Sequence, residues 1–128
     1  MKYYFEKTLN CSFDEALERV TDELQKEGFG VLTEIDVQST LKKKLDVNFR
    51  NYRILGACNP TFAYKALLTE INIGTMLPCN VVVQQHLDGQ IKITAIDPIA
   101  SMQAIQNENL TSIAKEIRLK LERIIKVV

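Results

Sequence analysis

The residues of this sequence that could do chemistry are few, and Cys58 is the most notable. Cys58 closes an apolar run and precedes Asn59-Pro60, where an N-cap side chain is followed by the residue best suited to a first helical turn. A thiol at such a point lies near unpaired backbone amides and the positive end of a helix dipole, which can lower a thiol pKa or bind an anion. The alternative is that Cys58 is a small buried apolar residue, as free cysteines often are.

Chain connectivity predicts that further functional residues gather near Cys58. In an antiparallel sheet, the chain that leaves after Cys58 must return, so the strand that begins at Cys79 starts near the same end. The hairpin that follows carries Asp97 back to that end. We therefore predict a ligand-binding rim at one end of the sheet, with these candidate residues: Cys58, Asn59, Pro60, Gly74, Pro78, Cys79, Asn80, Asp97, Pro98 and Met102.

The cysteines and the histidine match no known metal or disulfide pattern. Three cysteines are an odd number, and their wide spacing fits neither a disulfide framework nor a structural zinc signature, so we expect reduced thiols. His86 is the only histidine, and we expect it to be an exposed strand residue at the opposite end of its hairpin from Cys79. We therefore assign no residue as a metal ligand, and the sequence identifies no cofactor.

Other signatures of catalysis or of charged partners do not occur. The sequence has no phosphate-binding loop, nucleotide fingerprint, nucleophile elbow or catalytic triad spacing. Lys42, Lys43 and Lys44 are adjacent, but consecutive helical positions fan around the helix, which favours a solvated surface over a phosphate site. Sixteen basic residues balance sixteen acidic ones, so we predict neither a nucleic acid nor a membrane as partner.

Length and composition favour one domain over residues 1–128. A chain of 128 residues with 46% apolar residues is able to bury a hydrophobic core without disulfides. The first seven residues include Lys2, Glu6 and Lys7 and lack the apolar core of a signal peptide, and no run approaches membrane-spanning length. We therefore expect a cytoplasmic protein.

Hydrophobic periodicity and capping residues predict an α+β fold. Ser12 and Glu15 form a capping box before a helix that Gly28 ends, and Asp36 can cap a short helix. The predicted order is strand, helix, four strands with two short helical insertions, and a long helix, which favours an antiparallel sheet with its helices mainly on one face. The predicted strands are 3–9, 29–35, 52–58, 79–86 and 90–97, and the predicted helices are 13–27, a short one after Asp36, 60–70 and 108–126.

Asp88-Gly89 is the strongest hairpin signal in the chain. If these are the two turn residues, Val83 lies opposite Thr94 and Asn80 lies opposite Asp97. Both faces of the hairpin are then apolar near the strand start. A large apolar sheet surface is disfavoured in water, so we expect the second face to be covered by helix 60–70, by the loop after it, or by another copy of the chain.

Long strings of this sequence resemble the bacterial and archaeal family catalogued as domain of unknown function 302. The strings are Gly28 to Val37, Tyr52 to Pro60, Leu77 to Val83, and Asp97-Pro98. The resemblance implies a fold like that of the TATA-binding protein and a homodimer, but it implies no DNA binding, because a shared architecture does not carry function. It implies no established activity. Asn51 and Tyr64 depart from the family pattern, where proline and often histidine are expected.

These residues are compatible with three functions. The leading hypothesis is a homodimeric module that binds a small-molecule, anion or soft-metal ligand at the rim formed by Cys58, Asn59, Cys79 and Asp97. The second is a thiol redox or thiol-transfer enzyme, with Cys58 as nucleophile and Cys79 as resolving partner, although the sequence lacks a Cys-x-x-Cys motif. The third is a non-catalytic interaction domain whose motifs shape the dimer. Whether the protein is an enzyme stays open.

Overall fold

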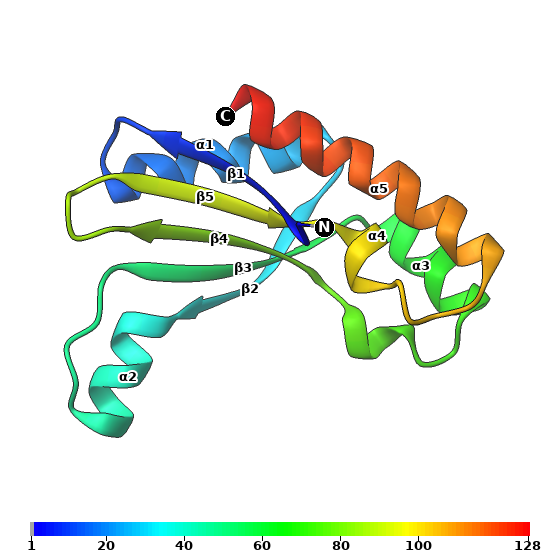
Figure 1. The fold of residues 1–128 in the computed structure, drawn as a ribbon, viewed down its shortest axis with the longest axis horizontal. Coiled ribbons are helices and arrows are strands. Elements are labelled where there is room, and N and C mark those ends of the chain that lie inside the picture. Colours follow the sequence, from blue (N-terminus) through cyan, green and yellow to red (C-terminus); the bar gives the residue numbers. More distant parts are fainter. Residues whose placement is uncertain (1) are drawn as a thin grey trace.

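One antiparallel sheet organises residues 2–128, the part of the chain that the computed structural model describes. The sheet has the strand order β1-β5-β4-β3-β2, and every neighbouring pair is antiparallel, which confirms the predicted α+β class (Figure 1). The elements are β1 (Tyr4–Leu9), α1 (Phe13–Lys26), β2 (Gly30–Asp36), α2 (Val37–Leu45), β3 (Tyr52–Cys58), α3 (Pro60–Thr69), the 3-10 turn η1 (Ile73–Met76), β4 (Cys79–Gln85), β5 (Ile91–Ile96), α4 (Pro98–Ser101) and α5 (Glu108–Val127). Neither η1 nor α4 was predicted.

Local capping explains where α1 begins and ends. The Ser12 hydroxyl accepts a hydrogen bond from the backbone N–H of Glu15 at 3.1 Å, as the capping box predicts. At the other end, Gly28 has a φ of +86°, and the N–H of Phe29 donates to the carbonyl of Leu24. This left-handed turn satisfies carbonyls of the last helical turn and directs the chain into β2.

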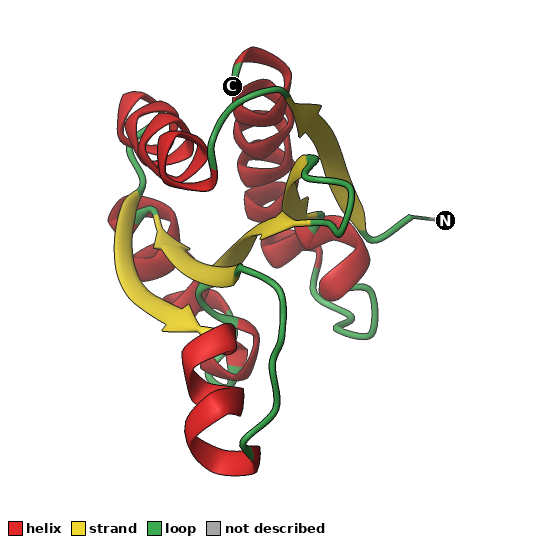
Figure 2. Cartoon of the chain, turned by 90° about the vertical axis from the view of Figure 1, so that its left-hand side faces the viewer, coloured by secondary structure: helices red, strands yellow, loops and turns green. Residues whose placement is uncertain are grey.

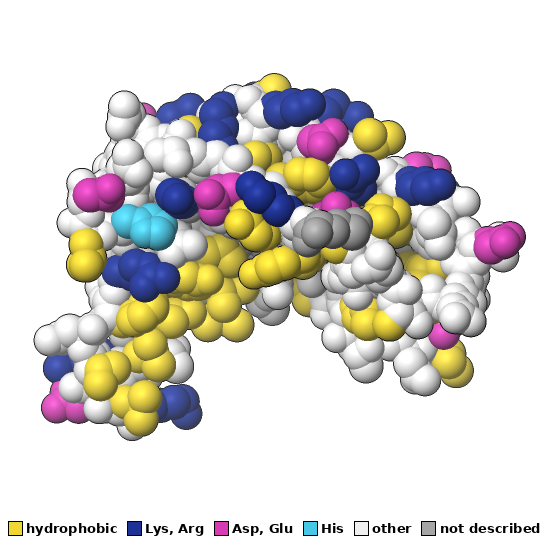
Figure 3. All heavy atoms as spheres, in the orientation of Figure 1, with side chains coloured by type: hydrophobic (Ala, Val, Ile, Leu, Met, Phe, Trp, Pro, Cys, Tyr) yellow, Lys and Arg dark blue, Asp and Glu magenta, His cyan; other side chains and the backbone are white. Residues whose placement is uncertain are grey.

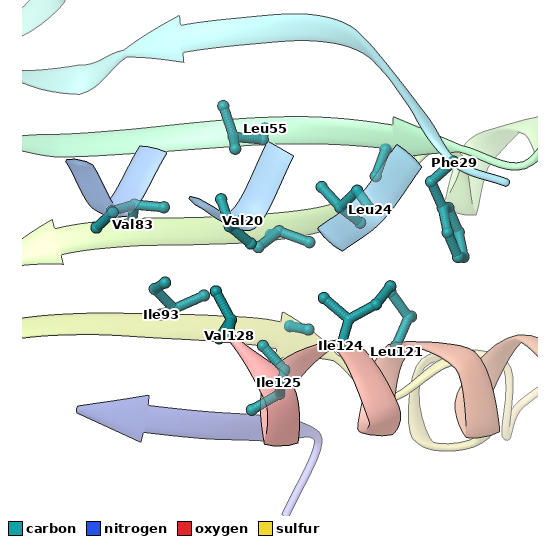
Figure 4. Close-up of a cluster of buried hydrophobic side chains, with 14 of the residues drawn as sticks. Val20, Leu24, Phe29, Leu55, Val83, Ile93, Leu121, Ile124, Ile125 and Val128 are labelled. Atoms are coloured by element: carbon teal, nitrogen blue, oxygen red, sulfur yellow. The ribbon is translucent and has the colours of Figure 1, made fainter. Parts of the chain in front are cut away.

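Helices α1 and α5 lie on one face of the sheet and bury the main hydrophobic core (Figures 1 and 2). Figure 4 shows side chains from both helices meeting side chains of β3, β4 and β5. The periodicity of α5 puts Leu121, Ile124 and Ile125 in this core, all of them buried. No helix within residues 2–128 has the length and apolar character needed to cross a membrane.

The hairpin between β4 and β5 differs from the prediction by one residue. Its connection is a three-residue loop, because His86 pairs with Gln90 and the N–H of Gly89 donates to the carbonyl of His86. Gly89 has a φ of +85°, the conformation that a three-residue hairpin loop requires at its last position. As a result, Val83 lies opposite Ile93 instead of Thr94.

This shift changes which side chains share a face. With the observed pairing, β4 and β5 turn buried residues toward the helices, and these are Cys79, Val81, Val83, Ile91, Ile93 and Ala95. The opposite face of the same strands is mixed, with Asn80, Gln84, Lys92 and Thr94 beside Val82 and Ile96. The predicted division of residues between the two hairpin faces was therefore wrong, since a slip of one residue moves a strand's side chains to the other face, and the second face is of mixed polarity.

Helix α3 does not cover the second face of the sheet, so the first of the three covers expected for that face was wrong. It packs on α5 and η1 at the end of the sheet instead. The uncovered face carries an apolar row in which Ile35 lies opposite Ile54, and Ile54 lies opposite Val82. Ile35 is 48% exposed. Figure 3 shows apolar side chains gathered in the hollow between α2 and the α3 end of the molecule.

Candidate functional site

A cavity of about 320 Å³ lies at the end of the sheet where β3 stops and β4 starts. It is partly open to solvent and is lined by α3, α5, the start of α4, the ends of β2 and β3, and the segment that leads from η1 into β4. We call it the end cavity. Seven of the ten candidate residues line it, namely Cys58, Asn59, Gly74, Pro78, Cys79, Pro98 and Met102.

Small side chains on facing helices create the space of the end cavity. Ala63 and Ala66 line it from α3, and Ala114 lines it from α5. Longer side chains would close the gap, because protein interiors otherwise pack to crystal-like density. The cavity also separates the main core from a smaller buried cluster built around Ala66, Ile73 and Leu110.

Asn59 is the one lining residue whose side chain carries an amide, and it does not act as predicted. It occupies the N-cap position of α3 but makes no side-chain cap hydrogen bond. Its Nδ2 instead donates to the backbone carbonyl of Glu27 at 3.3 Å, which ties the start of α3 to the end of α1. Asn59 is buried at this junction, so the cavity has one polar anchor in an otherwise apolar wall.

The two rim cysteines lie on neighbouring strands. Cys79 is directly opposite Ala57, the residue before Cys58, so the Cα atoms of Cys58 and Cys79 are about 6 Å apart. That separation alone would permit a disulfide, but Cys58 follows Ala57 in β3 and therefore projects to the opposite face of the sheet from Cys79, and both thiols are free. Burial, with a smaller contribution from the nearby Cys58, raises the pKa of the Cys79 thiol to about 11.

Three candidate residues lie outside the end cavity. Pro60 is exposed at the first position of α3, and Asn80 is exposed on the sheet face turned away from the main core. Asp97 is buried, and its carboxylate has structural partners. It accepts hydrogen bonds from the backbone N–H of Ile99 at 3.0 Å and from Nε of Arg118 at 3.1 Å. Asp97 therefore lies at the predicted end of the sheet, but its carboxylate binds groups of α4 and α5 and does not line the cavity.

Two lysines that were not predicted as site residues lie near Phe62, which lines the cavity from α3, and one of them, Lys120, pairs with Glu27 at 3.5 Å. The Lys65 ammonium lies 5.4 Å from the Phe62 ring centroid, and the Lys120 ammonium lies 5.9 Å from it. Glu27 accepts two hydrogen bonds from Arg123, and this contact lowers the pKa of the Glu27 carboxyl. No sequence signal marked this group, because its members come from α1, α3 and α5.

The other chemistry-bearing residues are far less concentrated. Within residues 2–128, no three side chains of the histidine, cysteine, aspartate and glutamate types gather in a way that could hold a metal ion. His86 is half-buried after the end of β4, not exposed within a strand as expected, and its Nε2 is buried without a hydrogen-bond partner. Lys42, Lys43 and Lys44 are exposed, and Lys42 pairs with Asp46 at 2.7 Å.

Comparison with known proteins agrees with the resemblance seen in the sequence. The family model described as "Domain of unknown function DUF302" matches residues 5–128. A crystal structure of an uncharacterized conserved protein DUF302 from Bacillus stearothermophilus is similar over 98% of each chain, with 29% sequence identity and a TM-score of 0.91. No curated protein matches the chain.

Proposed function

The chain belongs to the family described as Domain of unknown function DUF302, and from that starting point we propose that it binds a small, largely apolar molecule in the end cavity. The observation that carries this proposal is the composition of the cavity wall. All lining residues except Asn59 are apolar residues, cysteines or glycine. Ligand pockets typically combine such a wall with a few polar groups that orient the ligand.

The size of the cavity supports the same proposal. Its volume of about 320 Å³ is at the lower end of the range of known ligand pockets. At about 30 Å³ for each non-hydrogen atom, the space a water molecule takes in the liquid, it would hold roughly ten such atoms.

The other ligand classes considered from the sequence have less support. The cavity wall has no basic side chain that could neutralise an inorganic anion buried in it. A soft metal would find two thiols, Cys58 and Cys79, and the raised pKa of Cys79 opposes the thiolate form that binds metals. The same raised pKa counts against Cys79 as the resolving thiol of a redox pair, since the thiolate is the reactive species.

The proposal is tested with octanol, a neutral ligand of nine non-hydrogen atoms that matches the cavity volume of about 320 Å³. Octanol is titrated into isotopically labelled protein, and backbone amide NMR shifts are followed. We expect saturable shifts at Cys58, Ala66 and Ala114, which line the cavity. Shifts spread over the surface, or none at saturating octanol, would contradict the proposal.

A cavity-filling variant provides the matched comparison. Ala63→Phe adds a ring at a half-buried position of the cavity wall and should abolish the saturable shifts. Ala104→Phe makes the same change at an exposed position outside the wall and should leave octanol binding intact. Equal octanol binding by both variants would show that the ligand does not occupy the end cavity.

A further inference from the structure

Phe62 lies at one side of the end cavity and is partly exposed to solvent. Its half-buried ring lines the cavity and also packs against the main core. The ammonium groups of Lys65 and Lys120 lie 5.4 Å and 5.9 Å from the centroid of the same ring. Ammonium groups stay hydrated at protein surfaces, so two positive charges lie at the solvent side of a ring that lines the cavity.

The charges around Phe62 do not cancel. Glu27 is the carboxylate of this group, and it is engaged first by Arg123 through hydrogen bonds of 2.9 Å and 3.0 Å. Lys120 lies farther from Glu27, at 3.5 Å. Lys65 takes part in none of the ion pairs formed within residues 2–128. Arg123 and Lys120 therefore share one carboxylate, while Lys65 has no ion-pair partner among the described residues.

The cavity and its cations are arranged along α5. The helix lines the cavity from Leu110 to Ile117, a length of about 10 Å at 1.5 Å per residue. Lys120 follows Ile117 by three residues, so it projects from the same face of α5 about one turn beyond the cavity wall. An extended ligand along this wall therefore has apolar contacts along its length and Lys120 beyond one end.

From this arrangement we propose that the ligand is an anionic amphiphile, with an unbranched apolar chain in the end cavity and one anionic headgroup between Lys65 and Lys120. The inference rests on the proposed function, since it names the chemical class of the molecule that the cavity takes. The chain lies along α5 toward Leu110, and the headgroup remains next to the Phe62 ring, partly in water. Lys65 forms no ion pair within residues 2–128, so the headgroup would not have to displace a carboxylate from it.

The test compares octanoate, octanol and methyl octanoate, which share a chain but differ in charge. We expect the wild-type protein to bind octanoate more tightly than methyl octanoate, measured by NMR titration. The double variant Lys65→Gln/Lys120→Gln should lose about tenfold in octanoate affinity, the effect of two partly exposed charge pairs, and should bind octanol as the wild type does. High salt should weaken the binding of octanoate but not that of octanol.

A matched control separates local charge from net charge. Lys43→Gln/Lys44→Gln removes the same number of positive charges from exposed positions of α2, and it should bind octanoate as the wild type does. An equal loss in both double variants would overturn the inference. If Lys65→Gln/Lys120→Gln does not fold, wild-type affinity for octanoate no higher than that for methyl octanoate, with no salt dependence, would overturn it as well.

The two proposals fail in distinguishable ways. If neither octanol nor octanoate shifts the amides that line the cavity, the proposed function is lost together with the inference. If octanol binds and octanoate affinity does not depend on Lys65 and Lys120, the cavity binds an apolar molecule and only the anionic headgroup is rejected.

Discussion

Ala57 and Cys79 lie directly opposite each other in the pairing of β3 with β4, and both are buried. Cys79 therefore faces the core side of the sheet at the strand end where it lines the cavity. Desolvation disfavours a buried thiolate, which is why the pKa of Cys79 is raised to about 11. The raised pKa should lower the reactivity of the Cys79 thiol and lower the stability of the folded protein at alkaline pH.

Cys79 should be the least reactive thiol of the folded protein. A pKa raised from 9.0 to about 11 lowers the thiolate fraction at neutral pH roughly 100-fold. We expect iodoacetamide to label Cys58, which is half-buried, well before Cys79, as followed by mass spectrometry of digested protein. The redox hypothesis additionally requires Cys58 to react faster than Cys11. Equal slow labelling of Cys11 and Cys58 would remove it.

Cys79 should also make the protein less stable at alkaline pH. Its folded pKa is above its unfolded value, so the stability it contributes is full below about pH 9 and is lost as the pH rises toward about 11. At pH 10 the loss should be about 1 kcal/mol, because the unfolded thiol ionises and the folded one does not. Urea unfolding of wild type and Cys79→Ala at neutral pH and at pH 10 measures this difference. A parallel decline in both proteins would contradict it.

Gly56 should not tolerate a side chain. A Cβ atom at Gly56 would overlap the Thr33 hydroxyl and lie 2.7 Å from Cγ of Pro78. We expect Gly56→Ala to lower the free energy of unfolding by about 1–3 kcal/mol, the usual cost of overpacking. Gly30→Ala, in the neighbouring strand, meets no atom within 4 Å and should be nearly neutral. Chemical denaturation of both variants tests the contrast, and similar losses would show that the crowding is not the cause.

Asp97 should be a structural residue and not a ligand-binding one. Its side chain is 4% exposed, caps α4 and pairs with Arg118. We expect Asp97→Ala to lower the free energy of unfolding by about 2–3 kcal/mol, because it removes a cap and leaves the guanidinium without its partner. Octanol binding should persist under conditions where the variant is folded. A selective loss of octanol binding with unchanged stability would return Asp97 to the ligand site.

The homodimer expected from the family resemblance remains a prediction, and the uncovered sheet face is where we expect contact. The apolar row Ile35, Ile54 and Val82 lies on that face, and burying such residues is favourable. Light scattering at micromolar concentration should give twice the chain mass. Ile35→Lys should dissociate the dimer, whereas Leu87→Lys, a change at a fully exposed hairpin position, should not. A monomeric wild type would contradict the prediction.

Local sequence patterns determined most elements of this fold. The capping box at Ser12, the glycine stop at Gly28 and the Asp36 cap place α1 and α2 where they were predicted, since each signal acts over a few neighbouring residues. The predicted strand 52–58 agrees with β3 at both ends. Connectivity was enough to bring Cys58, Cys79 and Asp97 to one end of an antiparallel sheet.

Tertiary structure alone decided how these elements fit together. The Asp88-Gly89 signal predicted a hairpin, but the pairing of β4 with β5 depends on burying Val83 and Ile93 together under α1 and α5, which selected a loop one residue longer. The end cavity exists because Ala66 and Ala114, distant in the sequence, line the same space between α3 and α5. Contacts between distant residues set the register of β4 with β5, the end cavity, and the placement of Lys65 and Lys120 beside Phe62. The caps and periodicities of the chain carry only local information.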